Sequence, residues 1–285
     1  GKGGEETAGM KGAGRAAAVA LVVLVPCLII ALIGSSIKHQ AMHAVELAVA
    51  SSSPRAASTS SLLENQKVTW QTLRPEHPAY YPTKIRLFTG KESSLYGHHR
   101  AILNMRSVLQ NGPSHTEVEI FHSLRVAAVR SVAWDKGAHV MVFPSFADYP
   151  DLHMISKTDI RGYASTGNNV VFLGGFGTLD VMNEIFGWQL QPVTYQEGPF
   201  YRSERNAHNT VMATMPSMVQ SGGERTFGVR IKSLPSNARS YYDSLGDSVL
   251  FAVRYDLGMV TYVASDMAPT GNAVWHKLLR AAVAL

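Results

Sequence analysis

Cysteine is nearly absent from this 285-residue chain, and charged residues are scarce at 16%. The single cysteine, Cys27, excludes a disulfide scaffold and leaves residues 28–285 without a thiol nucleophile or a thiolate metal ligand. Hydrophobic residues make up 46% of the chain, which excludes a wholly disordered protein. Only one segment is apolar enough to span a bilayer, which excludes a polytopic membrane protein.

Runs of basic residues are also missing. The formal net charge is +5, but the lysines and arginines are scattered along the chain, so we expect no nucleic-acid partner. The large C-terminal part has no Asn-x-Ser/Thr sequon and no disulfide, which favours the inner membrane of an organelle, mitochondrial in type. The secretory pathway or plasma membrane is the alternative location.

The apolar segment is an uncharged run from Ala16 to Gly34, flanked by Arg15 and Lys38. As a helix it would extend roughly 28 Å, which matches a hydrocarbon core of about 30 Å. A cleaved signal peptide is the alternative, but its apolar region is usually shorter, about 7–15 residues. We therefore expect a retained single-pass transmembrane helix in contact with the lipid bilayer.

A linker follows the run. Ser, Thr and Pro dominate the sequence SSSPRAASTSS at 51–61, and a composition of this kind is typical of a linker. The predicted organisation is a tail at 1–15, an anchor at 16–37, a linker at 38–83 and one α/β domain at 84–285.

Strand-like and helix-like segments alternate in the first half of this domain. Apolar runs such as HVMVF at 139–143 are typical of buried parallel strands. The order predicts a parallel, flavodoxin-like sheet with helices on both faces. Strands are expected at 84–89, 117–121, 139–143 and 169–173, and helices at 96–110, 126–135, 152–164 and 179–186.

The second half has a different pattern. The turn Asp256-Leu257-Gly258 separates two strand-like segments and predicts an antiparallel C-terminal hairpin. A terminal amphipathic helix is expected at 272–285. The further predicted strands are 210–214, 226–234, 248–255 and 258–266.

The order of these segments, with IRGYASTGNNVVFLGGFG at 160–177 and the late hairpin before a terminal helix, resembles the class I glutamine amidotransferase-like superfamily. The resemblance covers about residues 84–285. It implies a catalytic Cys at a glycine-rich elbow, where this chain has Gly174, Gly175, Phe176 and Gly177, and a His-x-Glu near Ser265, which is also absent. The resemblance therefore implies the scaffold of a degenerate, non-catalytic branch, a pseudoenzyme, and argues against the activity.

Several residues follow the predicted strands and are candidates for a ligand crevice, because ligands bind at the carboxyl ends of strands in open α/β folds. Each also has an ordinary structural explanation, such as a tight turn or a favourable helix start. We expect no catalytic residue, metal or cofactor. The candidate crevice residues are Tyr96, His98, Ser145, Gly174, Gly175, Phe176 and Asp180.

The stretch from Gln191 to Glu204 is rich in both aromatic and polar residues, a composition that suits a protein interface. The residues predicted to form this interface are Trp188, Tyr195, Phe200, Tyr201, Arg202 and Arg205.

Three functions are compatible with these patterns. The first is a non-catalytic, membrane-anchored module that acts through protein contacts as an accessory subunit of an organellar membrane complex. The second is a hydrolase or transferase with a noncanonical site built from Tyr96, His98, Ser145 and Asp180. The third is a small-ligand or glycan-binding domain that uses the same crevice. The first is preferred, since no nucleophile stands at the elbow.

Overall fold

The computed structural model describes residues 82–112, 116–135, 137–193, 198–221, 226–267 and 273–285. The chain divides into two units, Gly1–Lys67 and Val68–Leu285, and every described residue belongs to the second. The predicted tail, anchor and nearly all of the predicted linker lie outside the described residues. Among the residues that are described, no helix is both long and apolar enough to span a bilayer.

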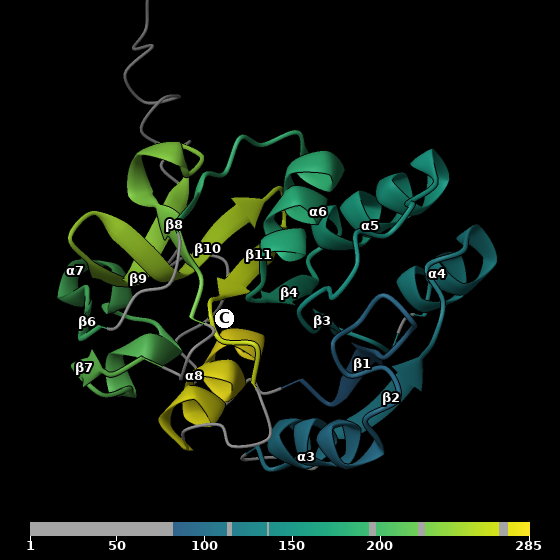
Figure 1. Ribbon diagram of the computed structural model, residues 1–285, viewed down its shortest axis with the longest axis horizontal. Helices are drawn as coiled ribbons and strands as arrows, with labels where there is room; N and C mark the ends of the chain where they lie inside the picture. The colour runs from purple at the N-terminus through teal and green to yellow at the C-terminus, as the bar shows by residue number, and fades with distance from the viewer. Residues whose placement is uncertain (1–81, 113–115, 136, 194–197, 222–225, 268–272) are drawn as a thin grey trace, which may run out of the picture. The chain divides into compact units, whose positions relative to one another are not determined.

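Strands and helices alternate through the first half, as the sequence predicts (Figure 1). The continuous apolar runs form strands that are buried on both faces, and the amphipathic segments form helices that place one apolar face against the core. The elements in chain order are β1 (Lys84–Phe88), α3 (His99–Gln110), β2 (Glu117–Phe121), α4 (Val126–Ala133), β3 (Val140–Phe143), α5 (Met154–Ser165), β4 (Asn169–Leu173) and α6 (Phe176–Phe186).

The second half is antiparallel and ends in a helix. The predicted hairpin is confirmed, and so is the terminal helix. The elements are β5 (Pro192–Val193), β6 (Phe200–Arg202), α7 (Glu204–Ala207), η1 (Val211–Thr214), β7 (Met218–Val219), β8 (Gly228–Arg230), η2 (Ile231–Ser233), β9 (Ala238–Ser244), β10 (Asp247–Tyr255), β11 (Gly258–Val263) and α8 (Ala273–Val283).

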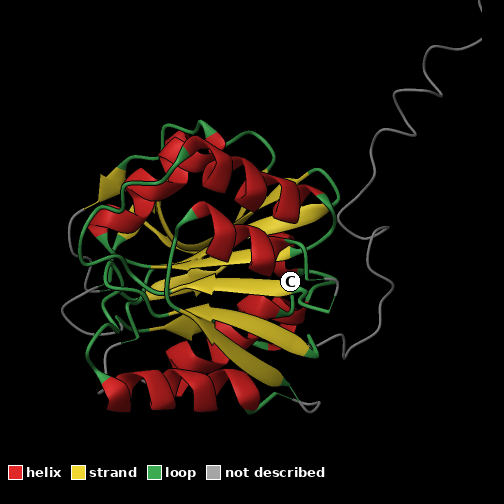
Figure 2. Ribbon diagram, turned by 90° about the vertical axis from the view of Figure 1, so that its right-hand side faces the viewer, coloured by secondary structure: helices red, strands yellow, loops and turns green. Residues whose placement is uncertain are grey.

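All strands join one sheet. Its main path runs β2-β1-β3-β4-β11-β10-β9-β6-β7, with β8 paired to β10 and β5. Pairing is parallel from β2 through β11 and antiparallel from there on, so the predicted parallel sheet is confirmed for the strands β2-β1-β3-β4-β11. Helices cover both faces of this sheet (Figure 2). Helix α5 packs against α4 and α6, whereas α3 packs against α8.

Two predicted strands are wrong. Residues 211–214 form the short 3-10 helix η1, in which the Thr210 side chain accepts a hydrogen bond from the Met212 backbone N–H at 3.2 Å. A threonine that caps a turn in this way competes with extended backbone. The predicted strand 226–234 is also mostly wrong, because only Gly228–Arg230 is a strand and η2 follows directly.

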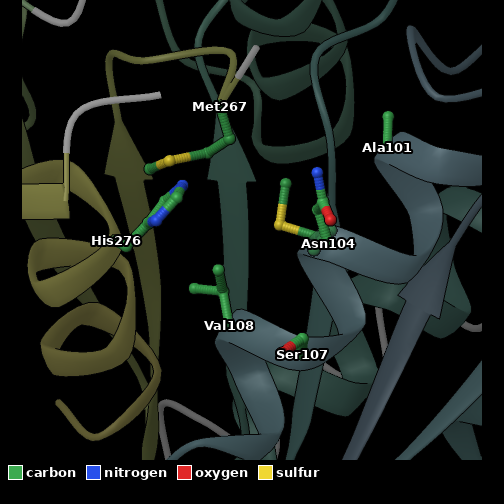
Figure 3. A pocket seen from close by; sticks show the side chains of 7 residues that line it. Ala101, Asn104, Ser107, Val108, Met267 and His276 are labelled. Carbon is green, nitrogen blue, oxygen red and sulfur yellow. The ribbon is translucent and has the colours of Figure 1, made fainter. Parts of the chain in front are cut away.

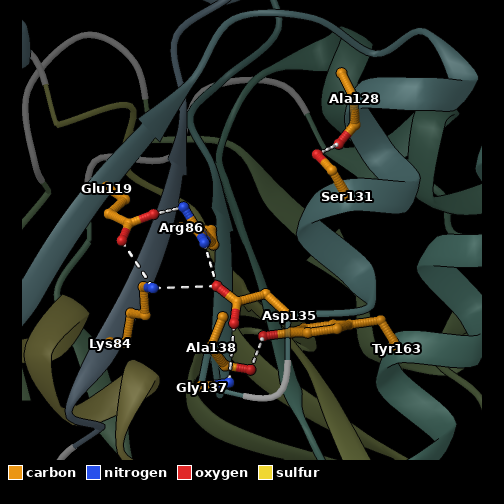
Figure 4. A network of polar contacts seen from close by, with 9 residues as sticks. All are labelled: Lys84, Arg86, Glu119, Ala128, Ser131, Asp135, Gly137, Ala138 and Tyr163. Carbon is orange, nitrogen blue, oxygen red and sulfur yellow. Dashed lines mark hydrogen bonds and ion pairs between the residues drawn. The ribbon is translucent and has the colours of Figure 1, made fainter.

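Four charged side chains form a network where β1 begins (Figure 4). Lys84 on β1 lies 2.7 Å from Glu119 on β2 and 3.1 Å from Asp135, which follows α4. Arg86 pairs with the same two carboxylates. The pKa of Asp135 is held well below its usual range by a hydrogen bond from the Gly137 backbone N–H, and further by Arg86 and Lys84. Two cations and two anions therefore neutralise one another at this end of the sheet.

We expect Asp135→Asn to lower the free energy of unfolding by about 1–3 kcal/mol at pH 7, since it leaves two partly buried cations with one carboxylate. A carboxylate whose pKa falls on folding stabilises the native state above its ordinary pKa, and this contribution is lost as the pH drops below that value. The difference between wild type and variant should therefore shrink between pH 7 and pH 3. Urea unfolding at both pH values tests this, and an equal difference at both would contradict it.

Candidate functional site

The carboxyl ends of β1, β3 and β4 meet where the strand order reverses direction, which is the usual ligand position of an open α/β sheet. Two side-chain hydrogen bonds lie there. The Ser145 hydroxyl donates to the Ser94 hydroxyl at 2.7 Å, and Thr89 shares a 2.8 Å hydrogen bond with His122. Ser145 is only 6% exposed. These side chains therefore satisfy one another's hydrogen bonds.

The glycine-rich turn after β4 is closely packed. A Cβ placed on Gly175 would lie 3.0 Å from the Ser145 Cβ and 3.4 Å from the Thr178 hydroxyl oxygen. Gly175 has a φ of +144°, which L side chains rarely adopt, and it makes a backbone hydrogen bond to the buried Tyr262 hydroxyl. A side chain at Gly175, in the turn where the resembled superfamily has its thiol, would therefore be tightly packed and held in a strained backbone conformation.

Purified protein is expected to show no glutamine hydrolysis, and Gly175→Cys should not create it. A thiol at this position would meet Ser145 and Thr178, and no His-x-Glu pair follows β11 to activate it. Ammonia release from glutamine measures the activity. Turnover by either protein above an enzyme-free control would contradict the expectation.

The proposed hydrolase residues do not form a constellation. Tyr96 is 60% exposed, and His98 and Asp180 are exposed as well. Ser145 is turned into the crevice toward Ser94, and no hydrogen bond between the four residues is found in the described part of the chain. The backbone of Phe176 begins α6, and the side chain of this residue lies outside what is described.

A polar cluster that the sequence did not indicate joins the loop after β3 to helices α5 and α6. The Tyr149 hydroxyl donates to Glu184 on α6, which also pairs with Lys157 on α5. Burial opposes ionisation of Glu184, but these two hydrogen bonds prevail and lower the pKa of its carboxyl. Desolvation and the hydrogen bond to Glu184 raise the pKa of Tyr149 to about 12. The Glu184 carboxyl is therefore ionised and the Tyr149 hydroxyl protonated at pH 7. Neither group has a pKa near 7, which a general acid or base would need.

The predicted interface residues have different surroundings. Phe200 is fully buried against Trp275, and Trp188 stacks on Phe186 with ring centroids 4.7 Å apart. Arg202 donates to Glu204 at 2.7 Å and to the Ala213 carbonyl oxygen at 2.6 Å. Tyr201 and Arg205 are exposed, whereas Tyr195 lies outside the described residues.

Tyr201 has an exposed neighbour that the sequence analysis missed. It pairs with Met218 across β6 and β7, at the end of the strand path, and the two side chains are 55% and 44% exposed. We call this pair the edge patch. The sequence gives little indication of the edge patch, because β7 has only two residues. Its pairing with β6 is set by the tertiary fold.

A separate pocket of about 180 Å³ opens between α3 and α8 (Figure 3). Its side chains mix thioethers and aliphatic groups with an amide, a hydroxyl and an imidazole. Burial, and secondarily the nearby Arg280 charge, lower the pKa of His276, so its ring is neutral at pH 7. The lining residues are Ala101, Asn104, Met105, Ser107, Val108, Met267 and His276.

Within the described ranges, no group of three or more His, Cys, Asp or Glu side chains is arranged to hold a metal ion. His98 and His99 are adjacent and both exposed. Nothing in their surroundings adds a third ligand from the described chain.

No family model matches the sequence, and no curated protein matches it. Solved structures give distant similarities. A cytoplasmic protein from Salmonella typhimurium LT2 has 14% identity and a TM-score of 0.45, over 70% of this chain and 95% of that one. A protein described as thua-like from Bacteroides uniformis has 10% identity and a TM-score of 0.43, over 71% and 91%.

An exo-beta-1,4-mannosidase from an Opitutaceae bacterium has 12% identity and a TM-score of 0.42, over 71% of this chain and 36% of that one. Thua-like proteins, with a class I glutamine amidotransferase-like fold, are therefore among the structural neighbours at low identity. Similarity this distant carries no argument about activity, and membership of a degenerate branch stays a prediction.

Proposed function

We propose that this protein is a non-catalytic, membrane-anchored accessory subunit that acts through protein contacts in an organellar, mitochondrial-type membrane complex. The observation that carries the proposal is the elbow itself, where a glycine stands and a Cβ on Gly175 would meet the Ser145 Cβ at 3.0 Å and the Thr178 hydroxyl oxygen at 3.4 Å. A scaffold of enzyme type with a glycine at its elbow is suited to binding rather than to catalysis.

The edge patch is the surface we assign to partner contact. Tyrosine and methionine are enriched at protein interfaces, and arginine often accompanies them. Tyr201 and Met218 present apolar surface side by side, and the exposed Arg205 follows on the same segment. Anchoring would raise the concentration of this patch near membrane partners, so even a modest interface would stay occupied.

The test compares Tyr201→Ser/Met218→Ser with Tyr96→Ser in the full chain. Tyr96 is a matched control because it is 60% exposed but lies on the loop after β1. After extraction in mild detergent, native electrophoresis should show wild type and the control in a larger complex and the double variant mainly as a free subunit. Migration of the wild type alone across several gentle detergents would contradict the accessory-subunit proposal.

The pocket between α3 and α8 favours a second candidate, the binding of a small uncharged molecule. Its polar rim of Asn104, Ser107 and the neutral His276 can exchange hydrogen bonds, while Met105 and Met267 supply apolar contact. A screen of small-molecule fragments by ligand-observed NMR distinguishes this candidate. Hits on wild type that are lost in Asn104→Ala, but kept in Tyr96→Ser, would support it.

A further inference from the structure

Both ends of the described chain lie near the end of the sheet where the parallel strands begin. Residues before β1 lead into the domain here, since β1 starts at Lys84. The chain also finishes here, because the Asn169 amide at the start of β4 donates to the Ala282 carbonyl oxygen of α8 at 2.8 Å. Figure 2 shows the C-terminus at one end of the strands. We call this the amino end of the domain.

Two large apolar side chains stand exposed at the amino end. Trp134, 75% exposed, directly precedes Asp135, whose carboxylate reaches Lys84 at the start of β1. Leu257, 67% exposed, occupies the turn between β10 and β11, and its backbone N–H donates to the Ser165 carbonyl oxygen at the end of α5. Turns of this kind favour Gly, Asn and Asp, so an exposed leucine has no role in forming the turn.

The charges beside Trp134 do not oppose contact with an apolar phase. Lys84 and Arg86 are each paired with Glu119 and Asp135, so this network presents no unpaired charge. A tryptophan combines a large apolar ring with one N–H donor, and such rings concentrate at the boundary between lipid headgroups and hydrocarbon.

We propose that the amino end of the domain rests on the bilayer, with Trp134 and Leu257 in the interfacial layer. This inference relies on the proposed anchor at 16–37. Tethering by the proposed anchor would raise the concentration of the domain at the membrane, so that a weak contact through two side chains would bias which end faces the lipid. The two side chains are uncharged and the exposed Asp256 beside Leu257 is anionic, so the proposed contact needs no anionic lipid and zwitterionic lipid suffices.

The chain provides a matched pair of probes. Leu257 and Leu245 both occupy hairpin turns of β10, but at opposite ends of that strand, and Leu245 is fully exposed. We would label Leu257→Cys or Leu245→Cys with a polarity-sensitive fluorophore, in a Cys27→Ala background, with the full chain in phosphatidylcholine vesicles. The label at 257 should emit at shorter wavelength and be quenched severalfold more strongly by bromine-labelled lipid than the label at 245.

Two further variants test whether the label itself causes the quenching at position 257. Trp134→Ser should weaken quenching of the label at 257, whereas Met154→Ser, at the start of α5, should leave it unchanged. Equal quenching at 257 and 245, or stronger quenching at 245, in protein that resists carbonate extraction would overturn the orientation and leave the anchor standing. Release of the protein by carbonate would instead overturn the anchor, and the inference with it.

Discussion

Gly174→Ala should lower the free energy of unfolding by about 3 kcal/mol or more, since the new methyl group has nowhere to go. A Cβ on Gly174 would lie 2.0 Å from the Ala264 carbonyl oxygen and 2.4 Å from its carbon, both backbone atoms. The Gly174 backbone N–H also donates to the Val263 carbonyl oxygen at 2.7 Å. Relief of the clash therefore requires separation of β4 and β11, the central parallel pair.

Gly162→Ala is the matched control for this substitution. Gly162 lies inside helix α5, and a Cβ there would meet nothing within 4 Å. Alanine is the better helix former, so this variant should be more stable than wild type by about 0.5–1 kcal/mol. Chemical unfolding followed by intrinsic fluorescence compares the two variants. An unchanged unfolding midpoint for Gly174→Ala would show that the strands move apart without cost.

Leu24→Arg/Leu28→Arg is expected to shift the protein from the membrane to the soluble fraction. Both leucines lie in the uncharged run, and arginine near the centre of a transmembrane helix costs about 2.5–3.5 kcal/mol per residue on insertion. The conservative variant Leu24→Ile/Leu28→Ile keeps the apolar character and should stay membrane-bound.

Alkaline carbonate extraction of native membranes measures this partition. Wild type and the isoleucine variant should remain in the pellet, and the arginine variant should appear in the supernatant. The anchor prediction does not survive if wild type is released by carbonate, or if both double variants behave alike.

The sequence by itself determined the elements whose signals are local. The buried runs at 139–143 and 169–173 became β3 and β4, and the turn at Asp256-Leu257-Gly258 became the β10–β11 hairpin. Strands that are buried on both faces have continuous apolar runs, and this signal lies within a few consecutive residues. The glycine-rich turn after β4 was predicted for the same reason.

Only the tertiary structure decided which side chains pack against that turn. Ser145 follows a different strand, and its contact with Gly175 depends on the pairing of β3 with β4. The pairing of Tyr201 with Met218 depends likewise on how the short strands β6 and β7 meet. Asn169 reaches Ala282 across 113 residues of sequence. These contacts join segments distant along the chain, and a local pattern of apolar and polar residues does not specify which distant segment will supply the partner.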